Sequence, residues 1–111
     1  MEWNVPMNQL ITGGDFGDVR IWDISQNRKS GEIPRAHELR ILSISCRKDG
    51  EFFSTVSADG FMYTWSSRDY ENMKSYKSDS GVYDVTWNAD GTRIALADKE
   101  GLVLLEFVCR V

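Results

Sequence analysis

The chain is short and mildly acidic, with 111 residues, 13 basic and 17 acidic side chains and a net charge of −4. This length allows at most one small domain with a modest core. An apolar content of 41% with 12% aromatic residues favours a folded globular chain. Because binding to nucleic acid relies on clustered Lys and Arg, and the longest basic runs here are pairs, we expect no direct nucleic-acid partner.

The cysteine and histidine content argues against a metal site and a disulfide framework. Two distant cysteines, Cys46 and Cys109, and one histidine offer three ligands, whereas a zinc site takes about four. We therefore predict no metal and no cofactor. The sequence has no signal-peptide pattern and no apolar run near the roughly 18 residues of a membrane helix. We expect an intracellular protein, cytoplasmic or nuclear, without a membrane partner.

Internal repetition is the strongest signal in the sequence. One set of landmark pairs is separated by 43 positions: Trp3 and Cys46, Gly17 and Gly60, Trp22 and Trp65. A second set is separated by 41 positions: Cys46 and Trp87, Asp49 and Asp90, Gly60 and Gly101. The whole chain, 1–111, is therefore predicted to be one segment of three repeats, at approximately 1–34, 35–76 and 77–111.

Each repeat is predicted to consist of short β-strands, because apolar and polar residues alternate with a period of two. In chain order, strands are expected at 41–46, 52–56, 61–66, 82–87, 93–97 and 102–107, and weaker fourth strands at 32–34 and 73–76. Asp-Gly and Glu-Gly pairs between them supply the positive φ that tight turns require. No stretch has convincing helical periodicity. The predicted fold class is all-β.

Repeats of about 42 residues with four strands and a terminal Trp22-Asp23 pair resemble the WD40 repeat, the blade of a β-propeller. The resemblance covers nearly the whole chain, and the second repeat matches best. It implies a buried hydrogen-bond relay formed by His37, Ser57, Asp59 and Trp65. Such a relay satisfies polar groups that would each cost about 1–3 kcal/mol if they were buried alone.

The other two repeats depart from this pattern. The first has Gly14 and Phe16 where Ser and Asp are expected, and no preceding His. The third has Glu106 in place of Trp, and residues 78–81 in place of a Gly-His pair. We therefore predict a complete relay in the second repeat only.

The repeat arithmetic limits the interpretation. A WD40 ring closes with about seven blades, and this chain supplies two and a half to three four-stranded antiparallel blades. We predict a partial β-propeller, the C-terminal part of a larger ring. A further resemblance of residues 73–76 and 81–89 to the last blade of transducin-β-like and Groucho-type corepressors agrees with this position.

Two sequence fragments imitate catalytic motifs. Asp15-Phe16-Gly17 spells the kinase tripeptide, but the companion catalytic loop and lysine strand of kinases are missing. His37-Glu38 begins like a zinc-protease motif, but Ile41 stands where the second His is required. We therefore predict no catalytic residues and no enzyme activity.

The predicted function is a non-catalytic scaffold that binds a protein or peptide, because propeller rims carry rigidly held loops. The candidate rim residues are Arg35, Glu38, Arg40, Tyr76, Asp79, Asp15, Phe16 and Asp18. The alternative is a repeat that completes a ring with further copies of itself, because exposed sheet edges invite pairing. The missing blades would come from a longer parent chain, a partner or self-association.

Overall fold

The computed structural model describes residues 1–26, 28–78 and 81–107. In this part of the chain all of the regular secondary structure is β-strand, and the strands form three antiparallel sheets. The first sheet contains β1 (Glu2–Asn4), β2 (Gln9–Gly13), β3 (Val19–Asp23) and β4 (Arg28–Ile33). The second contains β5 (Ile41–Cys46), β6 (Phe52–Ser57), β7 (Phe61–Ser66) and β8 (Asn72–Lys77). The third contains β9 (Val82–Trp87), β10 (Arg93–Asp98) and β11 (Gly101–Glu106).

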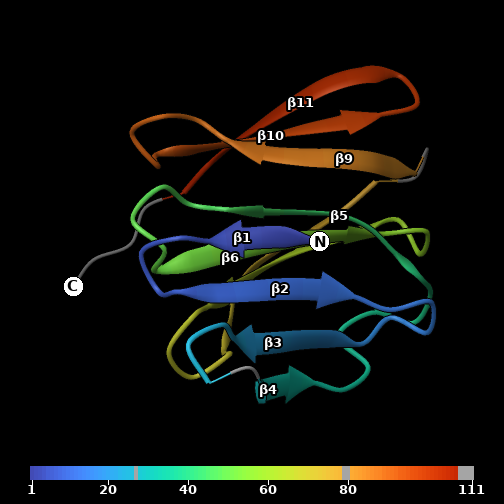
Figure 1. Ribbon diagram of the computed structural model, residues 1–111. Helices are drawn as coiled ribbons and strands as arrows, with labels where there is room; N and C mark the ends of the chain where they lie inside the picture. The colour runs from blue at the N-terminus through green and yellow to red at the C-terminus, as the bar shows by residue number, and fades with distance from the viewer. Residues whose placement is uncertain (27, 79–80, 108–111) are drawn as a thin grey trace.

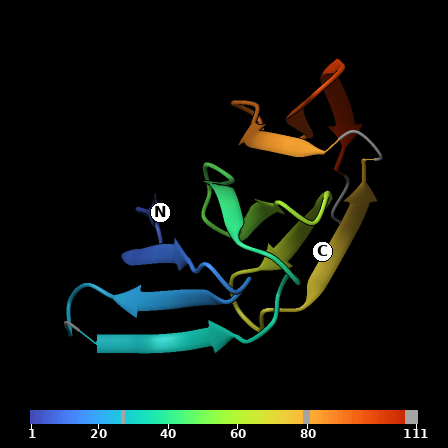
Figure 2. The same ribbon diagram turned by 90° about the vertical axis from the view of Figure 1, so that its right-hand side faces the viewer.

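The three sheets fan out from their first strands, which lie nearest one another (Figures 1 and 2). Within each sheet the strands follow chain order, so every connection inside a sheet joins antiparallel neighbours. Strands β2, β4, β6 and β10 all run toward the right-hand edge of Figure 1. The loops that follow these strands therefore gather along one edge of the molecule, which faces the viewer in Figure 2.

This architecture confirms the all-β prediction and the partial propeller. The expected strands at 41–46, 61–66 and 82–87 have those bounds, and the second strands extend one residue further than predicted. The fourth strands begin earlier than predicted, at Arg28 and Asn72, because polar side chains with no hydrophobic alternation pair with β3 and β7. The last strand covers 101–106 instead of 102–107.

Glycines at two turns have the backbone conformation that the Asp-Gly pairs predicted. Gly50 and Gly91 have φ values of 77° and 73° between the first and second strands of their sheets. This left-handed conformation strains residues that carry a Cβ, whereas glycine adopts it freely. The repeated pair therefore sets the same turn in two sheets.

Two apolar cores lie between neighbouring sheets. One core joins the first and second sheets and includes Ile11, Ile21 and Phe53 at 0% exposure. The other joins the second and third sheets and includes Val56, Met62, Ile94 and Leu96. Because β6 lies between both cores, all six of its residues are buried.

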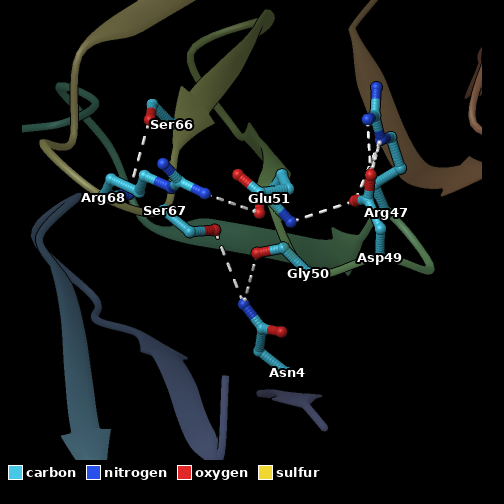
Figure 3. A network of polar contacts seen from close by, with 8 residues as sticks. All are labelled: Asn4, Arg47, Asp49, Gly50, Glu51, Ser66, Ser67 and Arg68. Carbon is cyan, nitrogen blue, oxygen red and sulfur yellow. Dashed lines mark hydrogen bonds and ion pairs between the residues drawn. The ribbon is translucent and has the colours of Figure 1, made fainter. Parts of the chain in front are cut away.

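A buried asparagine fastens the first sheet to the second at the edge opposite those loops (Figure 3). Asn4, at the end of β1, donates from Nδ2 to the carbonyl oxygen of Gly50 at 3.0 Å and to the hydroxyl of Ser67 at 3.5 Å. A Cβ at position 50 would overlap the other side-chain atom of this amide, Asn4 Oδ1. Glycine at this turn is therefore required both by its φ and by the close approach of Asn4.

Candidate functional site

The second sheet carries a buried chain of hydrogen bonds that runs from Trp65 to Asp59. The indole Nε1 of Trp65 donates to Thr55 Oγ1 at 3.0 Å. Thr55 Oγ1 lies 2.7 Å from His37 Nε2, and His37 Nδ1 lies 3.2 and 3.3 Å from the two carboxylate oxygens of Asp59. The chain therefore joins the loop before β5 to strands β6 and β7 and to the turn between them.

The donor count assigns the protonation of the imidazole. Because Thr55 Oγ1 accepts the indole proton, its own proton is available to His37 Nε2, and Nδ1–H then donates to Asp59. Burial lowers the pKa of His37 from its usual value, although the Asp59 carboxylate acts in the opposite direction. A neutral His37 with both nitrogens engaged is a positioning group and is not available as a general base.

Asp59 extends the relay to the backbone on both sides. Its carboxylate accepts from the amide N–H of Glu38 at 3.0 Å and of Phe61 at 2.9 Å. The loop that contains His37 is thus tied to the turn between β6 and β7. This tie fixes the neighbouring exposed side chains relative to the second sheet.

The middle member of this relay is Thr55, and the predicted Ser57 lies outside it. The hydroxyl of Ser57 donates to the carbonyl oxygen of Leu39 at 2.9 Å and accepts from the amide of Asp59 at 3.3 Å. Ser57 is the last residue of β6, whereas Thr55, two residues earlier on the same face, accepts the Trp65 indole proton. Both hydroxyls stabilise the loop, but only Thr55 connects Trp65 to His37.

The first sheet contains half of the relay. Trp22 Nε1 donates to Thr12 Oγ1 at 2.9 Å, and these residues lie 43 positions before Trp65 and Thr55. The position that matches Asp59 is Phe16, as the sequence predicted. The sequence reasoning missed Thr12, because the offset of 43 leads from the predicted Ser57 to Gly14 and reaches Thr12 only from Thr55.

The third sheet shows a second correction. Leu105, and not Glu106, occupies the place of Trp65: Leu105 pairs with Ile94 as Trp65 pairs with Phe53. The turn between β10 and β11 is one residue shorter than its counterpart, so the offset changes from 41 to 40 within the repeat. The side chain of Leu105 therefore packs against the core, whereas Glu106 is exposed.

The loops of residues 14–18 and 34–40 lie side by side at the loop edge that Figure 2 faces. The amide of His37 donates to the carbonyl oxygen of Gly17 at 2.9 Å, and the amide of Ile41 donates to Gly14 at 3.1 Å. Gly17 has φ 85°, and a Cβ there would overlap the His37 carbonyl. Close backbone packing therefore holds the two loops together across two sheets.

Several predicted rim residues surround a shallow hollow at this edge. Phe16, Arg35, His37 and Glu38 line a hollow of about 360 Å³. Phe16 is 86% exposed at the tip of its turn, and Arg35 has a left-handed φ of 54°. We call Asp15, Phe16, Arg35, Glu38 and Arg40 the rim cluster, all of them exposed.

The remaining rim candidates do not join this cluster. Asp18 is mostly buried and pairs with Arg20 at 3.2 Å, within its own sheet. Tyr76 lies on β8, partly buried against the core between the second and third sheets. Asp79 lies outside the described residues. Leu39, 51% exposed, belongs to the same loop as Arg35 and Glu38 but was not predicted.

Asp23 of the Trp22-Asp23 pair stabilises the turn after β3. Its carboxylate accepts from the Ser25 hydroxyl at 2.7 Å and from the amides of Ser25 and Gln26 at 3.0 and 3.3 Å. The Ser25 hydroxyl bond contributes most to a lowered pKa of Asp23. This aspartate is therefore a turn-forming residue.

The side chain of Cys46 lies in an environment that suppresses reactivity. Burial, with a contribution from Glu2, raises the pKa of the Cys46 thiol to about 12. Cys109 lies outside the described residues. Among the residues that the structure describes, there is no group of three or more His, Cys, Asp or Glu side chains that could hold a metal ion. The same residues include no helix long and apolar enough to cross a membrane.

Three radiating sheets, the relay and the Trp22-Asp23 pair define a class of repeat protein. Residues 29–66 match the family described as WD40, WD domain, G-beta repeat. This stretch is therefore a WD40 repeat, and the three sheets form part of a β-propeller. The crystal structure of the Cps50 (Swd1) β-propeller domain of Myceliophteria thermophila covers 99% of this chain with a TM-score of 0.85, at 22% identity and over 35% of that domain.

Curated relatives share this repeat at the sequence level. Over 82 residues, 74% of the chain, it is 33% identical to eukaryotic translation initiation factor 3 subunit I of Drosophila yakuba. The identity to the same subunit of Drosophila pseudoobscura pseudoobscura is 30% over an equal length. The chain spans about a quarter of the length of these relatives. The resemblance to corepressor blades stays a prediction.

Proposed function

We propose that this chain is a non-catalytic scaffold that binds a protein partner through its rim cluster. WD40 propellers are typical protein-interaction scaffolds, which supports the proposal that this chain binds a protein. The observation that carries it is the 86% exposure of Phe16 beside a hollow lined by Arg35 and Glu38. A large aromatic side chain that is exposed to water can bury its apolar surface against a partner, which favours binding.

The rim cluster has the rigidity that binding requires. Backbone hydrogen bonds join its two loops, and the Asp59 carboxylate accepts a hydrogen bond from the Glu38 amide. The backbone of such loops is already ordered and loses little conformational freedom when a partner binds. Acidic and basic side chains surround Phe16, namely Asp15, Arg35, Glu38 and Arg40. They favour a partner segment that places an apolar residue against Phe16 and polar or charged residues around it.

We also propose that the partner is a protein of translation initiation and that the chain is cytoplasmic. The relatives named as subunit I of translation initiation factor 3 support this assignment. If it is correct, a tagged chain should co-purify with other subunits of that factor, and Phe16→Ser should reduce the recovery. Unchanged recovery with Phe16→Ser would place the contact elsewhere on the molecule.

A peptide-display experiment tests the rim cluster without a known partner. The probe is a phage-displayed peptide library, selected on the wild-type chain and then measured against variants. We expect Phe16→Ser to weaken the selected peptides at least about tenfold, as expected for an aromatic hot spot. Met73→Ser is the matched control, since Met73 is 44% exposed on β8, outside the rim cluster. No selected peptide, or equal loss with both variants, would refute the rim cluster as the binding surface.

A further inference from the structure

Three described residues other than glycine have a left-handed backbone conformation. They are Asn8, Arg35 and Tyr70, with φ values of 54°, 54° and 60°. A residue that carries a Cβ is strained in this conformation, and asparagine tolerates it best. Such strain persists only where other contacts or a function offset it. The conformations of Arg35 and Tyr70 therefore each need a reason.

The packing of the fold accounts for Tyr70. Its side chain lies against the core between the first and second sheets. A Cβ at Gly31 of β4 would overlap the Tyr70 hydroxyl oxygen, so the ring end reaches the backbone of the first sheet. Tyr70 thus joins two sheets, and this contact offsets its strained backbone.

No comparable contact accounts for Arg35. It follows Pro34 in the turn after β4, where a positive φ usually selects glycine or asparagine. The residue is exposed, and its guanidinium has no ion pair or hydrogen bond with any other described residue. The Arg35 side chain therefore gives the described fold no polar contact that would offset the strain.

The backbone around Arg35 is nevertheless held firmly. The next two residues, Ala36 and His37, are buried, and the His37 amide donates to the carbonyl oxygen of Gly17 at 2.9 Å. The loop connects two four-stranded sheets, so both of its neighbours belong to this chain. The exposure of Arg35 is therefore a property of its own loop and not of an uncovered sheet face.

The hollow beside Arg35 offers a place for an anion. Arg35 and Glu38 line the same hollow of about 360 Å³, yet they form no ion pair with each other. A guanidinium presents parallel N–H donors that match the two oxygens of a carboxylate. Glu38 repels a carboxylate that enters the hollow elsewhere, and such repulsion fixes the register of a bound segment.

We propose that Arg35 selects a partner segment that carries an aspartate or a glutamate, whose carboxylate it binds beside the apolar residue that contacts Phe16. This inference rests on the rim cluster as the binding surface and names the chemistry of its partner. A glycine at position 35 would relieve the strain but could not bind the carboxylate. The strained arginine is therefore a specificity residue of the rim cluster.

Stability and binding should respond differently to Arg35→Gly in the full 111-residue chain. Glycine adopts a φ of 54° freely, so the variant should unfold at no lower urea concentration than the wild type. The binding probe is a peptide selected on the wild type from a phage-displayed library. Arg35→Gly should weaken this peptide at least about tenfold, because the hydrogen bonds lost are to a charged group. A variant clearly less stable than the wild type would give Arg35 a structural role and overturn the proposal.

Charge reversal tests the chemistry of the partner. Peptides selected on the wild type should share an acidic position, and peptides selected on Arg35→Glu should carry Lys or Arg at that position. Arg28→Glu is the matched control, because Arg28 is an exposed arginine at the start of β4, at the other end of this strand from the loop. Selection on Arg28→Glu should give the same acidic position as the wild type.

Phe16→Ser separates this inference from the proposed function. Selected peptides that lose affinity with Phe16→Ser, lack an acidic position and bind Arg35→Glu unchanged would keep the rim cluster and overturn the role of Arg35. An equal loss with Arg28→Glu would assign the effect to net charge and overturn it as well. A library that yields no peptide would refute both the rim cluster and the role of Arg35.

Discussion

Thr55 Oγ1 lies 2.7 Å from His37 Nε2 and joins a strand of the second sheet to the loop that carries Arg35, Glu38 and Arg40 of the rim cluster. The same oxygen accepts the Trp65 indole proton. The threonine is fully buried, so its two partners have no water to replace it. This contact couples the stability of the second sheet to the position of the proposed binding surface.

Replacing Thr55 should therefore destabilise the protein strongly. Thr55→Val keeps the shape but leaves two buried groups without a partner, and we expect a loss of about 2–4 kcal/mol in the free energy of unfolding. Thr12→Val in the half-buried first sheet removes one partner and should cost about 1 kcal/mol. Urea denaturation of both variants measures the difference. An equal loss in the two variants would contradict the relay.

The stability should depend on pH through His37. Because burial lowers the folded-state pKa of His37, the unfolded chain binds a proton more readily than the folded chain. The stabilisation is fully present above the unfolded pKa of about 6.5, decreases as pH falls below it, and is lost once pH has passed the lowered folded value. A single titrating group can give a slope of at most about 1.4 kcal/mol per pH unit. Urea denaturation between neutral pH and pH 5 measures it.

A His37→Gln variant is the control for this slope. Glutamine does not titrate, so the variant should be less stable than the wild type but should show a flatter dependence above pH 5. A slope that persists in the variant would assign the pH dependence to another group.

Gly17 should tolerate no side chain. Its φ is 85° and a Cβ would overlap the His37 carbonyl, so Gly17→Ala should cost at least about 2 kcal/mol. Gly81 is the matched control, because its φ is 90° and nothing lies within 4 Å of a Cβ there. Gly81→Ala should cost only the backbone strain of about 1 kcal/mol. Thermal denaturation that ranks the two equally would show that the loop contact is dispensable.

Phe16 should contribute to binding and not to stability. Since its side chain is 86% exposed, Phe16→Ser should change the free energy of unfolding by less than about 0.5 kcal/mol. Denaturation of the same variant that is used for peptide binding measures this. A large loss of stability would show that Phe16 packs as a structural residue, and its binding data would then lose their meaning.

The thiol of Cys46 should react slowly in the native protein. With a pKa of about 12, little thiolate exists at pH 8, so alkylation should be on the order of a thousandfold slower than in the urea-unfolded chain. A Cys109→Ser background limits the measurement to Cys46. Native alkylation at the unfolded rate would contradict the buried environment of this side chain.

The alternating strands and the Asp-Gly turns of this protein could be predicted from local sequence alone. Alternation of apolar and polar residues in 41–46 and 82–87 depends only on which face of a strand is buried. The Asp-Gly turns depend only on a positive φ, which is a property of glycine itself. The constant spacing of landmarks established the repeat, and the resemblance to the WD40 repeat implied the relay residues His37, Asp59 and Trp65.

The tertiary structure decided which side chains meet. Thr55 and Ser57 lie on the same face of one strand, and only the three-dimensional position of the Trp65 indole selects Thr55. The shorter turn before β11 moves Leu105 into the core, a shift that the repeat spacing of the glycines conceals. Tyr76 is polar enough for a rim, but the packing of the second sheet on the third partly buries it.

The exposure of a side chain could be learned only from the structure, because exposure depends on the neighbours of a residue and not on the residue itself. Trp3 and Trp87 occupy matching places in the repeat, yet one is 56% and the other 8% exposed. The sequence determined that both positions are apolar and belong to equivalent strands. The arrangement of the sheets decided which of them is covered, because a side chain at this place is buried only by the sheet that precedes it.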